Sequence, residues 1–119
     1  MDELDLDKLS KLVEQFAEER QWGEFHNIKN LVMSLSIESA ELMEIFQWLT
    51  PDQSERISEN EQQKERVSEE LADIFIYLLK IVNKLDLNLE EICYSKMDKN
   101  AKKYPVEKSR GRATKYTDF

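Results

Sequence analysis

The central segment of the chain reads LVMSLSIESAELMEIFQWL from Leu31 to Leu49. Its apolar residues recur at helical spacing and form two stripes on nearly opposite sides. One stripe holds Leu31, Leu35, Leu42, Ile45 and Leu49, and the other holds Met33, Ile37, Ala40 and Met43. A helix that is apolar on two sides has to be covered on two sides. We therefore predict a helix over residues 27–49, stopped by Pro51, that packs against more than one neighbour.

Three further helices are expected around this segment. They span residues 7–20, residues 63–85 and residues 88–104, and the last of them ends before Pro105. The helix over 63–85 has a second apolar side, as the central helix does. Residues 52–62 are strongly polar and are expected to form a mobile loop, and residues 107–119 are expected to form an extended tail.

These elements predict an all-α fold, in which a four-helix bundle-like subunit forms a single domain over residues 1–119. Two central helices with two apolar faces each have more apolar surface than one small bundle needs for its core. We therefore expect the subunit to assemble into a helical homo-oligomer, a dimer or a tetramer. A tightly wrapped monomer is the alternative.

Composition and charge exclude several classes of protein. Hydrophobic residues make up 40% and charged residues 35% of the 119, which excludes a low-complexity chain, and 2 Gly and 2 Pro are too few for the turns of a many-stranded β fold. A net charge of -8 disfavours nucleic acid as a partner. The single Cys93 excludes an intrachain disulfide, and the single His26 excludes metal sites with several imidazoles. Because no apolar run is long enough for a membrane span and the N-terminus is acidic, we expect a soluble, cytoplasmic protein.

Two pairs of acids stand where apolar residues are expected. Glu38 falls inside the first stripe of the central helix, and Glu41 lies at the edge of that stripe. On the helix over 63–85, Glu70 flanks the main stripe and Asp73 follows one turn later on the same side. Carboxylates gathered in a core repel one another, and neither stripe holds an Arg or Lys to compensate them. A divalent cation is the simplest compensator, and oxygen ligands alone favour Mg²⁺ or Mn²⁺.

Four sequence motifs accompany these acids. They read RQWGEFH (20–26), ELMEIFQW (41–48), EELADIFIY (69–77) and SKMDKNAKKYP (95–105). With the acidic quartet, they make the chain resemble the MazG-like all-α nucleoside triphosphate pyrophosphohydrolases, and within them the dCTP pyrophosphatase branch. The resemblance covers nearly the whole chain. One position departs from it, because many members carry a second glutamate just before the first acid of the quartet, where this chain has Ile37.

The resemblance implies an activity, a cofactor and an assembly. Members of this branch cleave a nucleoside triphosphate between the α and β phosphates, use Mg²⁺, and assemble as dimers or dimer-of-dimers tetramers. The expected substrate is dCTP or a modified dNTP, and the expected role is nucleotide-pool house-cleaning. The acids that would hold the metal and carry catalysis are Glu38, Glu41, Glu70 and Asp73. One of the glutamates would act as general base, and Glu41 is our preference.

The resemblance also implies substrate-binding residues outside the acidic quartet. Lys96, Asn100 and Tyr104 share one face of the helix over 88–104 and would contact phosphate, sugar or base; the alternative is a solvated helix face. Trp22, Phe25 and Trp48 would form a wall on which the base stacks, and His26 would contact a pyrimidine edge; the alternatives are an aromatic cluster closing a core and a structural histidine.

Two other functions remain open from the sequence. One is an all-α enzyme that hydrolyses dUTP. The other is a non-catalytic helical interaction protein whose acids only bind cations, since a chain with 25 acids contains many Glu-x-x-Glu spacings by chance.

Overall fold

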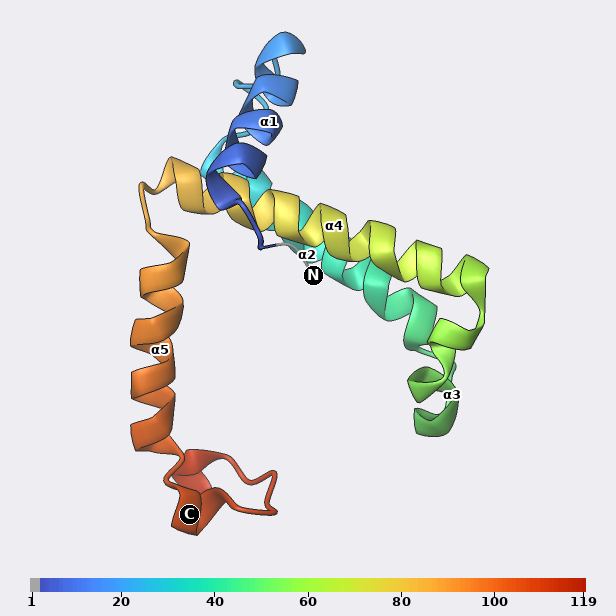
Figure 1. The fold of residues 1–119 in the computed structure, drawn as a ribbon, viewed down its shortest axis with the longest axis vertical. Helices are drawn as coiled ribbons and strands as arrows, with labels where there is room; N and C mark the ends of the chain where they lie inside the picture. Colours follow the sequence, from blue (N-terminus) through green and yellow to red (C-terminus); the bar gives the residue numbers. More distant parts are fainter. Residues whose placement is uncertain (1–2) are drawn as a thin grey trace. The chain divides into compact units, whose positions relative to one another are not determined.

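The computed structural model describes residues 3–119, and within them all regular structure is helical, as the sequence predicts. Five helices of five or more residues follow one another: α1 (Leu6–Glu19), α2 (Ile28–Phe46), α3 (Pro51–Glu55), α4 (Glu61–Lys84) and α5 (Leu89–Lys103). Shorter helical turns are η1 (Ile57–Glu59), α6 (Val106–Ser109) and η2 (Tyr116–Asp118). The chain divides into two compact units, the first ending at Leu85 and the second running from Asp86 to Phe119 (Figure 1).

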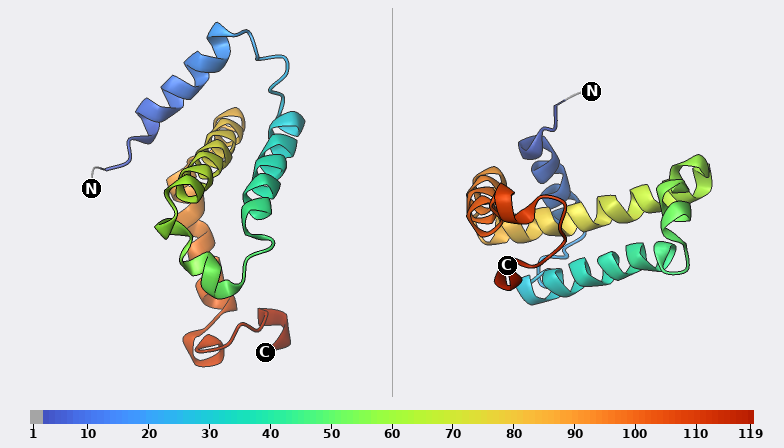
Figure 2. Two further views of the ribbon diagram at one scale, coloured as in Figure 1. Left: turned by 90° about the vertical axis from the view of Figure 1, so that its right-hand side faces the viewer. Right: turned by 90° about the horizontal axis from the view of Figure 1, so that it is seen from below.

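The first unit is built on the pair formed by α2 and α4. The two helices run antiparallel side by side, with α3 and η1 connecting them at one end (Figures 1 and 2), and α1 packs against α4. Each of the three long helices begins at a side-chain cap, with Asp5, Asn27 and Asn60 accepting from backbone N–H groups of the first turn. Leu31, which is fully buried, and Leu79 hold α2 and α4 in the core.

The two apolar stripes of α2 have different environments. The first stripe is covered, with Leu31 buried and its other members half-buried. The second stripe is exposed along its whole length, including Met33, Ile37 and Met43. One apolar face of α2 therefore lies in the core of the subunit, and the other lies on the surface of the chain.

The segment 52–62 differs from the polar loop that we expected. It is helical over most of its length, because α3 and η1 occupy it and α4 begins two residues earlier than predicted. The reason is local. Thr50 and Gln53 form a reciprocal capping box around α3, and Pro51 occupies the first turn. Asn60 then caps α4 by accepting a hydrogen bond from the backbone of Gln63 at 3.1 Å.

The second unit contains α5 and the C-terminal segment. We expected residues 107–119 to be an extended tail, and the structure corrects this prediction, because the last three residues of α6 and all of η2 fall within the segment. Aromatic contacts explain the difference. The ring of Tyr104 lies 5.7 Å from that of Tyr116 and 5.8 Å from that of Phe119, both edge to face. The guanidinium of Arg112 lies 5.6 Å from the centre of the Phe119 ring.

None of the helices in residues 3–119 combines the length and the apolar character that crossing a membrane requires.

Candidate active site: an acidic cluster and an apolar pocket

An acidic cluster lies on the paired helices of the first unit. Glu38 and Glu41 come from α2 and Glu70 comes from α4, and one carboxylate oxygen of each lies within 4.8 Å of the others. Glu38 and Glu70 are half-buried, whereas Glu41 is exposed. The Oε2 atoms of Glu38 and of Glu70 are buried, and neither has a hydrogen-bond partner among the described residues. The antiparallel pairing of α2 and α4 thus brings together acids that are 29 to 32 residues apart in the chain.

The cluster is electrostatically unfavourable without a cation. Burial, together with the adjacent carboxyl groups of Glu70 and Glu41, raises the pKa of Glu38 to about 7. The negative charge of Asp73 contributes as well. Asp73 is therefore close enough to act on the cluster electrostatically, although it is not one of its three converging members.

The cluster fits a hard divalent cation. Its donors are carboxylate oxygens, two of which are buried and unpartnered, and the ion pairs formed within residues 3–119 involve none of the three glutamates. A buried carboxylate needs a proton, a basic partner or a metal. Oxygen donors without thiolate or imidazole match Mg²⁺ or Mn²⁺. Glu38, Glu41 and Glu70 are thus the residues that could hold such an ion.

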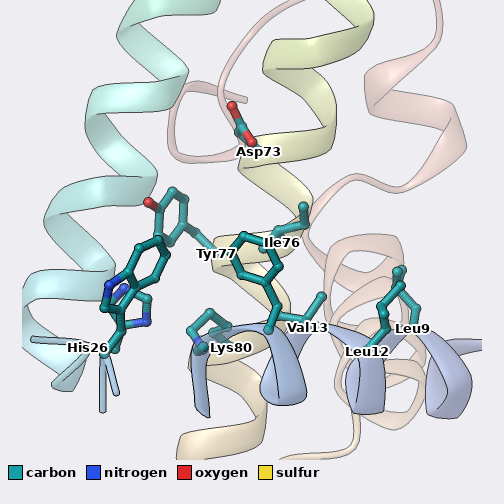
Figure 3. A pocket seen from close by; sticks show the side chains of 11 residues that line it. Leu9, Leu12, Val13, His26, Asp73, Ile76, Tyr77 and Lys80 are labelled. Atoms are coloured by element: carbon teal, nitrogen blue, oxygen red, sulfur yellow. The ribbon is translucent and has the colours of Figure 1, made fainter. Parts of the chain in front are cut away.

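A pocket of about 380 Å³ lies in the same unit (Figure 3). Apolar side chains of α1 form one wall, among them Leu12 and Val13. Four residues of α4 form the other wall: Asp73, Ile76, Tyr77 and Lys80. Trp22 and His26 close the pocket from the connection between α1 and α2. Because Asp73 lines the pocket and also acts on Glu38, the pocket adjoins the acidic cluster. An apolar cavity with a few polar groups beside it is typical of a small-molecule site.

Rings of three residues follow one another in the pocket. Trp22 and His26 have ring centres 5.6 Å apart, and His26 and Tyr77 have ring centres 6.5 Å apart, both edge to face. Nδ1 of His26 is buried and has no hydrogen-bond partner among the described residues. Burial lowers the pKa of His26, and the positive charge of Lys80 lowers it further. His26 therefore favours the neutral form, in which one ring nitrogen can accept a hydrogen bond.

The other two aromatic residues that we assigned to a base-stacking wall do not line this pocket. Phe25 is 60% exposed and Trp48 is 86% exposed. Trp48 follows the C-terminal end of α2, whereas Trp22 precedes its N-terminal end. The 19 residues of α2 separate the two ends by about 28 Å. A single chain does not bring Trp22 and Trp48 together.

The three residues predicted on the fourth helix lie in the second unit. Lys96 is exposed on α5, and the neighbouring charge of Lys103 lowers its pKa. Asn100 is half-buried near the end of α5, where its carbonyl accepts a hydrogen bond from the backbone N–H of Tyr104 at 2.8 Å. The ring of Tyr104 packs in the aromatic cluster of the C-terminal segment.

Sequence reasoning missed Tyr77 and Lys80 as residues of the pocket. A signal for Lys80 is present, because it is the single charge in the apolar run IFIYLLKIV from Ile74 to Val82. A lysine in such a run is buried only where it has a partner. For Tyr77, the signal is its place one turn after Asp73 on α4.

The chain is similar in sequence and in fold to known proteins. The MazG-like family model matches residues 33–119. The chain is 38% identical over 114 residues to dCTP pyrophosphatase 1 of Bos taurus, covering 96% of this chain and 68% of that protein. It is 34% identical to dCTP pyrophosphatase 1 of Homo sapiens, covering 96% of this chain and 67% of that protein. The crystal structure of a pyrophosphatase from Archaeoglobus fulgidus superposes with a TM-score of 0.77 at 39% identity, covering 88% of this chain and 96% of that one.

Proposed function

The chain belongs to the MazG-like family, and from this premise we propose that it cleaves the bond between the α and β phosphates of a dNTP, releasing dNMP and pyrophosphate. Whichever nucleotide is its substrate, the protein is a nucleoside triphosphate pyrophosphohydrolase. We propose dCTP or a 5-substituted relative of dCTP as the substrate, because dCTP pyrophosphatases are among its relatives. Removal of such nucleotides from the cytoplasmic pool is the corresponding role.

The observation that carries the proposal is the acidic cluster beside an apolar pocket. A triphosphate bears several negative charges, and it can approach carboxylates only with a cation between them. A nucleobase is flat and mostly apolar, and the aromatic and aliphatic walls of the pocket suit it. Asp73 lines the pocket and acts on Glu38, and we propose that the sugar and the α phosphate of a bound nucleotide lie beside it.

Each acid has a proposed role. Glu38, Glu41 and Glu70, with Asp73 beside them, would hold Mg²⁺ or, as a substitute, Mn²⁺. When bound, the ion supplies neutralisation of the charge that develops on the phosphoryl oxygens. Glu41 is our proposed general base, because it is the exposed member of the cluster and can accept a proton from water that reaches it from solvent.

The remaining predicted residues enter the proposal as substrate contacts. Trp22 and His26 would contact the base from inside the pocket. We propose that Lys96 contacts a phosphate as a point charge and that Asn100 and Tyr104 position the nucleotide. These three residues belong to the second unit. Substituting each of them singly and measuring kcat and KM would test its contribution to substrate binding.

We propose that the active protein is a homo-oligomer, a dimer or a tetramer. The exposed second stripe of α2 supports this, because a continuous apolar stripe on a helix marks an interaction surface. An oligomer would also explain why Phe25 and Trp48 are exposed. These side chains do not line the pocket of their own chain, but in an oligomer they could contact the pocket of a second copy.

Pyrophosphate release is the direct test. The common dNTPs, dUTP and 5-methyl-dCTP would each be incubated with the protein, with Mg²⁺ and with EDTA. Mg²⁺-dependent turnover that is fastest with dCTP or 5-methyl-dCTP supports the proposal. Turnover that is fastest with dUTP would instead identify the chain as a dUTP-hydrolysing enzyme. Absence of turnover with every nucleotide would contradict hydrolysis of dNTPs and favour a cation-binding interaction protein.

A further inference from the structure

Lys80 is a buried cation that lies outside the acidic cluster and has no role in the proposed reaction. Only 4% of its surface is exposed, and it stands on α4 between the apolar residues Leu79 and Ile81. Its partner is Glu14 of α1, whose Oε1 lies 3.7 Å from the Lys80 Nζ. This distance allows an ion pair but is too long for a hydrogen bond. Glu14 therefore compensates the charge of Lys80 without using its three N–H donors.

Lys80 and Asp73 mark opposite ends of the pocket wall on α4. Both line the pocket, and in Figure 3 they lie at its two ends along the helix. Seven residues of α-helix separate them, which is about 10 Å. Asp73 lies at the acidic cluster, whereas Lys80 lies with His26 at the other end. If the triphosphate lies at the cluster, the end with Lys80 receives the base.

The chemistry of that end selects the kind of base. An ammonium group only donates hydrogen bonds, and a charged donor forms stronger hydrogen bonds than a neutral one. Its natural partner on a nucleobase is a carbonyl oxygen. Cytosine, thymine, uracil and guanine each carry at least one, whereas adenine carries none. The unpartnered Nδ1 of His26 can accept a hydrogen bond from an amino group on the same edge of the base.

We propose that Lys80, with its charge balanced by Glu14, is a specificity-determining residue that donates a hydrogen bond to a carbonyl oxygen of the nucleobase. This inference rests on the proposed function and adds the group that reads the base. It excludes adenine, because adenine would leave a buried ammonium without a hydrogen-bond acceptor. Leaving a buried polar group unpaired is the strongest means by which a site rejects an analogue.

The competing explanation is that the pair of Lys80 and Glu14 only joins α1 to α4. Such a pair would affect the stability of the unit, or the activity toward all nucleotides alike. If Lys80 recognises the base, its loss would lower the activity toward nucleotides whose bases carry a carbonyl oxygen, and would not lower the activity toward dATP. The ratio of kcat/KM for dCTP to kcat/KM for dATP therefore separates the two explanations.

The test compares Lys80→Met with Lys84→Met under the same conditions. Lys84 lies one turn further along α4, is exposed, and does not line the pocket, so its substitution removes the same charge from outside the pocket. For the wild type and each variant, kcat/KM would be measured for dCTP, dTTP, dGTP and dATP with Mg²⁺. The double variant Lys80→Met/Glu14→Gln removes both charges and so leaves no carboxylate without its partner.

Loss of one charged hydrogen bond corresponds to a decrease of about 10- to 100-fold. We expect Lys80→Met and the double variant to decrease kcat/KM by this factor for the three nucleotides whose bases carry a carbonyl oxygen. For dATP, kcat/KM should stay unchanged or rise, because removal of the ammonium relieves the penalty on adenine. Lys84→Met should leave the ratios unchanged. An equal decrease for all four nucleotides would overturn the inference and leave Lys80 a structural residue.

A binding measurement tests the role of Lys80 separately from the proposed hydrolysis. Calorimetric titration with dCMP and dAMP, in EDTA, requires no turnover. Even if the wild type hydrolyses none of the dNTPs, preferential binding of dCMP that Lys80→Met abolishes would support Lys80 as the reader of the base. Equal binding of the two monophosphates by the wild type, or an unchanged preference in the variant, would overturn it.

Discussion

At the scale of single residues, Glu38 links the sequence pattern to the proposed chemistry. It interrupts an apolar stripe, and in the structure its carboxylate is half-buried beside Glu41 and Glu70 with one oxygen unpartnered. A carboxylate in this position destabilises the metal-free fold unless it binds a proton or a cation. The position of Glu38 therefore predicts a site that binds a proton or a cation.

Glu38→Gln should abolish hydrolysis while preserving the helical fold. Because the amide is neutral and similar in size, it fits the same space but removes one charged ligand from the cluster. We expect kcat/KM to fall by at least about 100-fold, as for loss of a major electrostatic contribution to catalysis. Pyrophosphate release measures the activity, and far-ultraviolet circular dichroism measures the fold. Glu65→Gln, an exposed acid on α4 outside the cluster, is the matched control and should keep full activity.

The pKa of Glu38 predicts how the stability of the metal-free protein depends on pH. The pKa is about 7 in the folded protein and 4.5 in an unperturbed chain, so between these values the folded state binds the extra proton. The free energy of unfolding should therefore fall as pH rises from about 4.5 to about 7. Thermal unfolding in EDTA would measure this. In Glu38→Gln the fall should be smaller, and an identical profile in both proteins would contradict the pKa shift.

Metal binding should depend on pH in the opposite sense. The cation competes with the proton on Glu38, so its binding strengthens as pH rises through about 7. We expect a millimolar excess of Mg²⁺ to raise the thermal midpoint more at pH 8 than at pH 6. The same increase at both values, or none at either, would show that the cluster does not bind the ion through Glu38.

At the scale of elements, caps determine where the helices begin. Asn60 ends the turn after η1 and starts α4, the helix that carries Glu70, Asp73 and Lys80. Polar composition alone predicted a loop over residues 52–62, because the segment has little apolar periodicity. Short helices that are held by a capping box and a proline do not need an apolar face, and for this reason the periodicity did not reveal α3.

Asn60→Ala should lower the free energy of unfolding by about 1 kcal/mol, the usual cost of losing an N-cap. The variant leaves the backbone N–H of Gln63 without its acceptor. Chemical denaturation measures the effect, at fixed protein concentration if the protein is an oligomer. Asn60→Asp keeps an accepting side chain and should stay within about 0.5 kcal/mol of the wild type. Equal destabilisation by both changes would show that the amide, and not the cap, matters.

At the scale of the whole molecule, the exposed second stripe of α2 is an apolar surface that the other described residues leave uncovered. Met43 belongs to this stripe and is 61% exposed. Met43→Glu should shift the protein toward the monomer, because it places a charge inside an apolar contact. Sedimentation velocity measures the shift. Lys11→Glu, an exposed position on α1, is the control and should leave the assembly unchanged. A wild-type protein that sediments as a monomer would contradict the proposed assembly.

The sequence by itself determined the four long helices and their faces. The predicted helices 7–20, 27–49, 63–85 and 88–104 agree with α1, α2, α4 and α5 to within three residues at each end, because apolar periodicity and caps act over a few neighbouring residues. It also singled out Glu38, Glu41 and Glu70, since a charge within an apolar stripe is visible in the pattern. Their assignment as metal ligands and that of the other predicted site residues stay predictions.

Only the tertiary structure decided which faces meet, and at which register. The pairing of α2 with α4 brings Glu70 to Glu38, and the packing of α1 on α4 brings Glu14 to Lys80 across 65 intervening positions. It also places Trp48 at the opposite end of α2 from Trp22. The physical reason is that helical periodicity sets the direction of each side chain around its own axis. The relative position of two helices depends instead on how their side chains pack, to which the whole unit contributes.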